Sequence, residues 1–153
     1  MKPRVLFLCT GNSCRSQMAE GFLRSLAGDR FNVASAGTDP VAVNPDAMKA
    51  MSEVGIDISD QESKAVKTFL GQHFAYVITV CDRASERCPI FPGAVKRLEW
   101  NFPDPAAVTE SDVERHRMFR QVRDQIADRI RDFLDSEVSS VNGSDDRARQ
   151  SRS

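Results

Sequence analysis

Eight consecutive residues near the start of the chain could bind and attack an oxyanion. They read Cys9-Thr10-Gly11-Asn12-Ser13-Cys14-Arg15-Ser16, so five residues separate a cysteine from an arginine. A loop of successive backbone N–H groups that leads into a helix binds a tetrahedral oxyanion without net positive charge. Gly11 adopts backbone conformations closed to other residues, and the planar guanidinium of Arg15 matches two oxygens of a bound anion. The pattern predicts an anion-binding P-loop from Cys9 to Ser16.

Cys9 is the candidate nucleophile of this loop. Backbone N–H groups and the Arg15 guanidinium favour a thiolate, so we expect a lowered pKa at Cys9. Ser13 or Ser16 would add a hydroxyl donor to the sulfur. The alternative is a buried cysteine at the end of a strand, followed by a solvated arginine in the first helical turn. The strand before the loop, its Gly-Asn-Ser interior and the helix after it favour the anion site.

The elements around the loop predict an α/β fold. Short apolar runs indicate strands, and apolar residues at helical spacing indicate helices. Strands are predicted at residues 5–8, 31–36, 76–80 and 95–100, and helices at residues 16–26, 46–54, 63–71 and 110–138. This alternation predicts a four-stranded parallel sheet flanked by helices in three layers, with a ligand site beyond the carboxyl ends of the strands. The loops after Leu8, Val80 and Trp100 would then share one edge.

The composition describes one ordinary domain. The 153 residues include 21 basic and 22 acidic side chains, which nearly cancel, so we expect no nucleic-acid partner. The longest apolar runs are far shorter than the ~20 residues of a membrane span, and the start of the chain lacks a signal-peptide pattern. We therefore expect a cytoplasmic protein without a membrane partner. Residues 1–138 form the predicted domain, and residues 139–153 lose apolar periodicity and form a predicted flexible tail.

Two more cysteines, Cys81 and Cys88, follow the third predicted strand, on the edge that carries Cys9. In a reducing compartment such cysteines are catalytic, metal-binding or buried more often than permanently bridged. Neither this pair nor Cys9 with Cys14 has the Cys-x2-Cys spacing of most zinc sites, so no bound metal is predicted. Inert buried thiols remain an alternative for the pair. We assign no catalytic role to Cys14, which lies in the loop beside Arg15.

These segments resemble the low-molecular-weight tyrosine phosphatase superfamily over residues 2 to about 137. Its signature is a strand, a Cys-x5-Arg-Ser loop and a helix reading roughly Met-Ala-Glu, as in Met18-Ala19-Glu20. Ser35-Ala36-Gly37-Thr38 and Phe102-Pro103-Asp104-Pro105 match two further segments of the superfamily. The resemblance implies a low-molecular-weight phosphatase-like fold and a general-acid role for Asp104. Taken alone, an aspartate in an Asp-Pro turn is an ordinary turn former.

Cys81 and Cys88 look like the redox pair of the thioredoxin-coupled arsenate reductases, a branch of the superfamily. The resemblance implies reduction of arsenate to arsenite, with a disulfide passing from Cys9 to Cys81 to Cys88. It also implies arsenate as substrate, phosphate or sulfate as analogues, thioredoxin as electron donor, no bound cofactor and a monomer. Residues 82–87 would form a short helix in the reduced enzyme that loosens on oxidation. The alternatives are a phosphatase with a phosphocysteine intermediate at Cys9, or a non-catalytic anion-binding or redox-sensing module.

The chain departs from the superfamily at several positions. Gln17 stands where the phosphatases usually have proline, and Ala106-Ala107 stand where they have aromatic residues; both changes disfavour an aryl substrate. Some arsenate reductases of this family bind potassium near the loop. The matching residues here are Asn12, Glu20, Ser35, Glu62 and Lys64. Because the last of them is a cation, we predict no potassium requirement.

Overall fold

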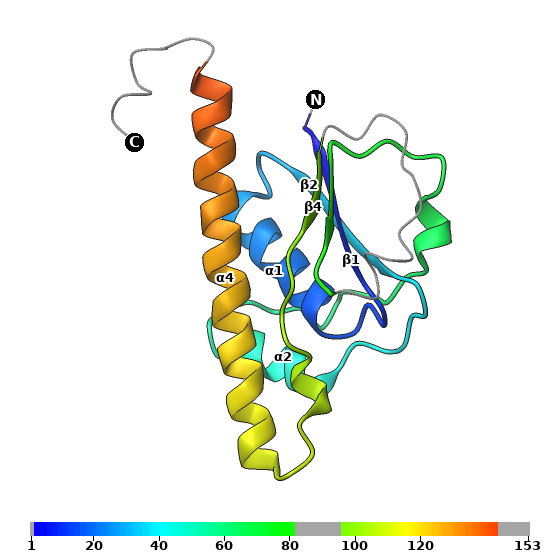
Figure 1. The fold of residues 1–153 in the computed structure, drawn as a ribbon, viewed down its shortest axis with the longest axis vertical. Helices are drawn as coiled ribbons and strands as arrows, with labels where there is room; N and C mark the ends of the chain where they lie inside the picture. Colours follow the sequence, from blue (N-terminus) through cyan, green and yellow to red (C-terminus); the bar gives the residue numbers. More distant parts are fainter. Residues whose placement is uncertain (1, 82–95, 144–153) are drawn as a thin grey trace.

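The computed structural model describes residues 2–81 and 96–143, with side chains described up to Glu137 (Figure 1). Its strands are β1 (Arg4–Cys9), β2 (Asn32–Gly37), β3 (Tyr76–Thr79) and β4 (Lys96–Glu99). They form one parallel sheet in the order β2-β1-β3-β4. The predicted four-stranded parallel sheet is therefore confirmed, and β1 lies inside it with Val5, Leu6, Phe7 and Leu8 fully buried.

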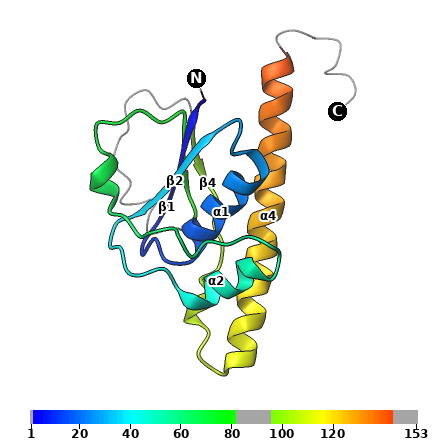
Figure 2. The same ribbon diagram turned by 180° about the vertical axis from the view of Figure 1, so that it is seen from behind.

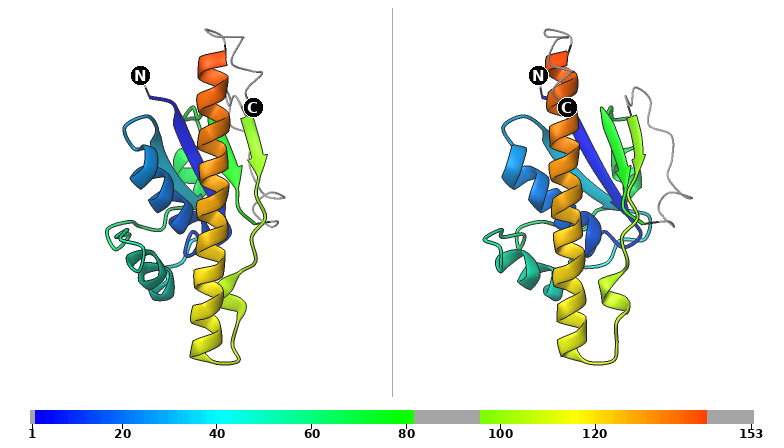
Figure 3. Two further views of the ribbon diagram at one scale, coloured as in Figure 1. Left: turned by 90° about the vertical axis from the view of Figure 1, so that its left-hand side faces the viewer. Right: turned by 60° about the vertical axis from the view of Figure 1, so that its left-hand side comes forward.

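Helices lie on both sides of the sheet. Its described helices are α1 (Arg15–Ala27), α2 (Pro45–Ser52) and α4 (Asp112–Gly143), with the short 3-10 helices η1 (Val66–Phe69) and η2 (Pro105–Ala107). Figure 2 shows α1 and α2 beside α4 on one side of the sheet, with η1 on the other. Figure 3 shows α4 running across the face of the molecule past α1, α2 and the sheet. This layering matches the predicted three-layer α/β fold.

Aromatic packing attaches α4 to the sheet. The ring of Phe133 lies 5.2 Å from Tyr76, 5.8 Å from Phe31 and 5.9 Å from Trp100, measured between centroids. Burial of a large apolar side chain stabilises a fold by roughly 1.5–3 kcal/mol, and centroid distances of this size are favourable for aromatic pairs. The cluster fixes the helix against the starts of β2 and β3 and against Trp100, which follows β4.

Two predicted elements differ from the structure. Residues 63–71 were expected to form a helix, but only Val66–Phe69 form a 3-10 turn. The backbone before that turn is bonded elsewhere, since Lys64 accepts from Gly37 at 2.8 Å and Ala65 bridges to the same residue. The second difference concerns α4, which continues to Gly143, so the first residues of the predicted tail are helical. Residues 144–153 lie outside the described part of the chain.

The membrane prediction concerns helices that could cross a bilayer. Within the described residues, no helix is both long and apolar enough to do so.

Candidate active site

The predicted anion loop lies where β1 ends and α1 begins. Cys9 is the last residue of β1, and α1 starts at Arg15. Beside the loop is a cleft of about 570 Å³. The residues that line it are Cys9, Thr10, Gly11, Ser13, Cys14, Arg15, Val41, Asn44, Cys81, Asn101, Phe102, Asp104 and Ala106. The loops after β1, β3 and β4 thus meet at one edge, as the strand order predicted. Cys88 lies outside the described residues.

Backbone N–H groups of the segment after β2 hold the loop carbonyls outward. The donors are the N–H groups of Thr38, Asp39, Val41 and Asn44. Their acceptors, at 2.8–3.3 Å, are in the same order the carbonyls of Cys9, Thr10, Gly11 and Ser13. In a trans peptide the N–H group points opposite to the carbonyl that precedes it. The N–H groups that follow these carbonyls therefore point away from the segment and into the loop. This arrangement organises donors for an oxyanion before one binds.

Asn12 and Ser16 serve the loop differently from its other residues. Asn12 is fully buried, and its side-chain amide donates to the hydroxyls of Ser16 and Ser35, both at 2.9 Å. The backbone N–H of Ser16 donates to the Cys9 sulfur. The hydroxyl of Ser13 donates to the Ala42 carbonyl at 2.9 Å. The side chains of Asn12 and Ser16 therefore do not line the cleft. These two residues contribute backbone groups to the anion site.

The guanidinium of Arg15 spans the cleft. Its side chain is 13% exposed, and Nη2 lies 3.9 Å from Asp104 Oδ2. Nη1 donates to the Phe102 carbonyl at 3.1 Å, which fixes the plane of the group. Among the described residues, Arg15 Nε is buried without a hydrogen-bond partner. An unsatisfied buried donor costs ~1–3 kcal/mol, and an oxyanion in the loop is the natural acceptor for it.

Cys81 lines the same cleft as the candidate nucleophile. Cys9, Cys14 and Cys81 are free thiols and buried, and Cys81 is the largest influence that raises the pKa of Cys9. The Thr10 hydroxyl lies 3.4 Å from the Cys81 sulfur. The two cysteines at the carboxyl ends of neighbouring strands thus line one cleft, on the shared edge that the sequence predicted.

The expected lowering of the Cys9 pKa is wrong for this form of the protein. The hydrogen bond with Cys81 and the burial of the thiol raise its pKa well above the ordinary value. The charge of Arg15 and the Ser16 N–H act in the expected direction, but they do not prevail. The sequence placed Cys81 on the same edge, but it did not reveal how strongly that thiol and the loss of solvent act on the Cys9 sulfur. Cys9 therefore holds its proton more tightly than a free cysteine, and this proton has to leave when the sulfur attacks.

Cys14 and Asp104 complete the cleft. Burial raises the pKa of Cys14 to about 11, so it remains protonated at neutral pH. Asp104 caps η2 by accepting from the Ala106 N–H at 3.0 Å. Its side chain is 46% exposed. Asp104 therefore forms a turn, and this turn places its carboxylate near Arg15; its general-acid role stays a prediction.

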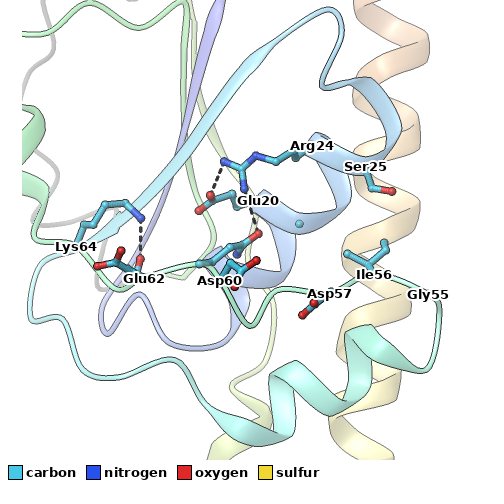
Figure 4. A pocket seen from close by; sticks show the side chains of 11 residues that line it. Glu20, Arg24, Ser25, Gly55, Ile56, Asp57, Asp60, Glu62 and Lys64 are labelled. Carbon is cyan, nitrogen blue, oxygen red and sulfur yellow. Dashed lines mark hydrogen bonds and ion pairs between the residues drawn. The ribbon is translucent and has the colours of Figure 1, made fainter.

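A second pocket, of about 630 Å³, contains residues matched to the potassium site of some relatives. Figure 4 shows the Lys64 ammonium on the Glu62 carbonyl, at 2.7 Å, and Arg24 on Glu20, at 2.6 Å. The other oxygen of Glu20 accepts from Ser35 at 2.5 Å. These oxygens already have donors, so the residues do not fit a potassium ion. Within the described residues there is also no cluster of three or more His, Cys, Asp or Glu able to hold a metal.

Residues 4–143 match the protein family described as low molecular weight phosphotyrosine protein phosphatase. The chain belongs to this family. It is also 47% identical over 135 residues to an arsenate reductase of Shouchella clausii, covering 88% of this chain and 97% of that protein. The predicted resemblance to the phosphatase superfamily and its arsenate reductases is thereby confirmed.

Solved structures show the same relationship within the family. An arsenate reductase in the phosphate binding state aligns with a TM-score of 0.72 and 35% identity, covering 89% of this chain and 98% of that chain. A thioredoxin-dependent arsenate reductase of Corynebacterium glutamicum aligns with a TM-score of 0.73 and 30% identity, covering 91% of this chain and 63% of that one. The fold and its position in the family are therefore established by both sequence and structure.

The sequence prediction missed the segment from Thr38 to Asn44. It contributes backbone donors to the loop, and backbone donors leave no signature in residue types. The only available signal was the match of Ser35-Ala36-Gly37-Thr38 to the superfamily, which marks where this segment begins.

Proposed function

We propose that this protein reduces arsenate to arsenite, with Cys9 as nucleophile and Cys81 as the second thiol. The observation that carries the proposal is the second thiol, Cys81, which lines the cleft of the oxyanion loop together with Cys9. A phosphatase needs a nucleophile, an arginine and an acid, but no second thiol against the nucleophile. The relatives named arsenate reductase support the same reading.

The first step forms a bond between sulfur and arsenic. The loop N–H groups and Arg15 bind the arsenate oxygens, as they would bind phosphate or sulfate. The Cys9 sulfur attacks arsenic, and one As–O bond breaks. The thiol proton departs with that oxygen as water, and the Asp104 carboxyl passes it between the two atoms. Arsenic is still pentavalent at this point.

The second step is the reduction. The Cys81 sulfur attacks the Cys9 sulfur, so an S–S bond forms, the S–As bond breaks, and the Cys81 proton passes to an oxygen of the departing arsenite. The electron pair of the broken bond stays with arsenic, which leaves as trivalent arsenite. The Thr10 hydroxyl, 3.4 Å from the Cys81 sulfur, donates to the attacking thiolate and stabilises it. The product on the enzyme is a Cys9–Cys81 disulfide.

The last steps restore the thiols. Cys88 attacks Cys81 by thiol–disulfide exchange, which frees Cys9 and leaves a Cys81–Cys88 disulfide. The dithiol of thioredoxin then reduces this disulfide, so no bound cofactor is needed. The printed name of the Corynebacterium relative, thioredoxin-dependent, supports this donor. We propose that the cycle runs in a monomer in the cytoplasm, where a reducing environment keeps the three cysteines available.

The alternative is a phosphatase that hydrolyses phosphoesters through a phosphocysteine at Cys9. The same loop, arginine and aspartate would carry that reaction. It would leave Cys81 and Cys88 without a chemical role, and variants of either residue would then retain full activity.

The test is NADPH oxidation that depends on arsenate, with thioredoxin and its reductase present. The wild type should turn over, whereas Cys81→Ser and Cys88→Ser should stop. Without thioredoxin, Cys88→Ser should still release about one arsenite per enzyme, because the Cys9–Cys81 disulfide can form. Cys81→Ser should release none. The protein would be a phosphatase if the wild type is inactive with arsenate and all three proteins hydrolyse an aryl phosphate equally well.

A further inference from the structure

The carbonyl of Asn12 is held differently from the other loop carbonyls. Those of Thr10, Gly11 and Ser13 accept from backbone N–H groups. The Asn12 carbonyl accepts from side chains, Nε2 of Gln17 at 3.0 Å and the hydroxyl of Ser63 at 2.7 Å. Residue types therefore decide the orientation of this one peptide group.

Asn12 also has an uncommon backbone conformation. Its φ is 48°, which makes it the only residue other than glycine with positive φ in the described part of the chain. Such conformations persist only where the surroundings impose them. The peptide between Asn12 and Ser13 is consequently a position where the loop can turn over if a support is removed.

Gln17 is the dedicated donor to this carbonyl. It is fully buried, and its amide carries two hydrogens, one directed to the Asn12 carbonyl and one to the Glu62 carbonyl, both at 3.0 Å. The Ser63 hydroxyl has a single hydrogen and lies against two acceptors, the carbonyls of Asn12 and Val41. It serves one of them at a time. Gln17 supplies the hydrogen bond that Asn12 has in either case.

The orientation of the Gln17 amide is itself fixed. Gln61 Nε2 donates to Gln17 Oε1 at 2.7 Å and to the Gln17 carbonyl at 3.0 Å. Gln61 Oε1 accepts from Arg24 at 3.2 Å, and Arg24 pairs with Glu20, as Figure 4 shows. Because the amide oxygen of Gln17 faces Gln61, its NH2 group faces Asn12. The flip state of each amide is thus determined by its partners.

We propose that Gln17 is a positioning residue for the anion loop. By holding the Asn12 carbonyl outward, it directs the N–H of Ser13 into the cleft. Without this bond the peptide can turn, so that a carbonyl oxygen replaces an N–H donor at the anion. The inference rests on the proposed oxyanion site, but not on arsenate being its substrate.

The experiment measures protection of Cys9 by inorganic phosphate against iodoacetamide, with the Cys9 peptide quantified by mass spectrometry. Gln17→Met keeps the length of the side chain and removes both donors. Loss of one oriented hydrogen bond to the anion should raise the half-protecting phosphate concentration about tenfold. The variant should also alkylate Cys9 at higher pH than the wild type, because fewer N–H groups stabilise the thiolate.

Gln72→Met is the matched control. Gln72 also uses its side-chain amide, with Arg4 at 2.7 Å and the Thr68 carbonyl at 3.3 Å, far from the loop. This variant should protect Cys9 at the wild-type phosphate concentration. If phosphate protects Cys9 of Gln17→Met at the wild-type concentration as well, the inference is overturned. A lowered melting temperature of that variant would then show only a structural role for Gln17.

Gln61→Met tests the same chain of contacts from one step further away. It leaves Gln17 in place but removes the donor to its amide oxygen, so we expect a smaller, roughly threefold rise in the half-protecting concentration. Unchanged protection in this variant counts against the inference even if Gln17→Met does not fold. If the wild type does not turn over arsenate, the reductase proposal is contradicted. The half-protecting phosphate concentrations of the variants relative to the wild type would still test the role of Gln17.

Discussion

The sulfur of Cys9 experiences opposing influences from its neighbours. The hydrogen bond with Cys81 and burial raise its pKa, whereas Arg15 and the Ser16 N–H lower it. A raised pKa opposes attack, because the thiolate is the nucleophile, so the proton has to leave Cys9 in the proposed first step. At the scale of single residues, therefore, Cys81 acts on the nucleophile before it acts as a reductant.

Replacing Cys81 with alanine should shift the titration of Cys9. The substitution removes the largest influence that raises the Cys9 pKa, so Cys9 should react with iodoacetamide at lower pH than in the wild type. Alkylation rates of the Cys9 peptide across pH 6–10, the range around the ordinary thiol pKa of about 8.5, give the measurement. Cys14 in the same protein is an internal control whose curve should not move. A Cys9 curve displaced to higher pH would contradict the assignment.

Removing the Thr10 hydroxyl should slow the second chemical step and spare anion binding. Thr10→Val keeps the shape and the backbone N–H but loses the contact with the Cys81 sulfur. One charge-assisted hydrogen bond corresponds to roughly a tenfold slower release of arsenite in a single turnover. Protection of Cys9 by phosphate should be unchanged. Equal loss of both properties would show that the variant disturbs the loop instead.

Contacts between elements hold the walls of the cleft. Asp46 in the first turn of α2 accepts from Arg115 at 2.8 Å and contacts His116 Nε2 at 3.1 Å. Both partners are in α4, so these contacts join α2, which follows Asn44, to α4, which follows the loop that carries Asp104. Burial by itself raises the pKa of Asp46, but Arg115 and His116 outweigh it and lower that pKa.

The stabilisation from Asp46 should depend on pH. Because the folded-state pKa is lowered, the contribution is complete above the ordinary value of 3.8 and is lost as pH falls through the depressed pKa. Asp46→Asn should therefore unfold at about 0.5 M less urea than the wild type at pH 7. The two midpoints should converge well below pH 3.8. An equal gap at both pH values would mean that the carboxylate charge is not the cause.

Elements were predictable where hydrophobic patterning decided them. The strands β1 and β3 follow from apolar runs, and the helix predicted at residues 46–54 is α2, whose Asp46 N–H donates to the Asn44 side chain at 2.7 Å. The predicted helix at 63–71 failed because the Lys64 backbone is bonded to β2 and to the Asn12 side chain. Contacts between residues so far apart in the chain leave no periodicity to read, and the same holds for Asp46 with Arg115.

The molecule as a whole depends on the aromatic cluster beneath α4. Phe133 is 5% exposed and contacts rings from the region before β2, from β3 and from the end of β4. Phe133→Ala should lower the free energy of unfolding by about 3–5 kcal/mol. Val113→Ala, at a side chain 67% exposed on the same helix, should change it by less than about 0.5 kcal/mol. Urea unfolding of both variants measures the difference, and similar losses would show that the cluster does not anchor α4.

The register of β1 and β3 has a consequence for how such enzymes diverge. Leu8 lies opposite Thr79, and the Val80 N–H bonds to the Leu8 carbonyl at 2.8 Å, so Cys9 and Cys81 follow the last paired positions of adjacent strands. Adjacent strands lie roughly 4.8 Å apart, which is within the Cα separations of about 4.4–6.8 Å that a disulfide spans. A thiol at that strand end can therefore reach the loop nucleophile without any rebuilding of the sheet. Because the proposed cycle also needs the resolving thiol of Cys88, the change from hydrolysis to reduction requires two added cysteines on an unchanged scaffold.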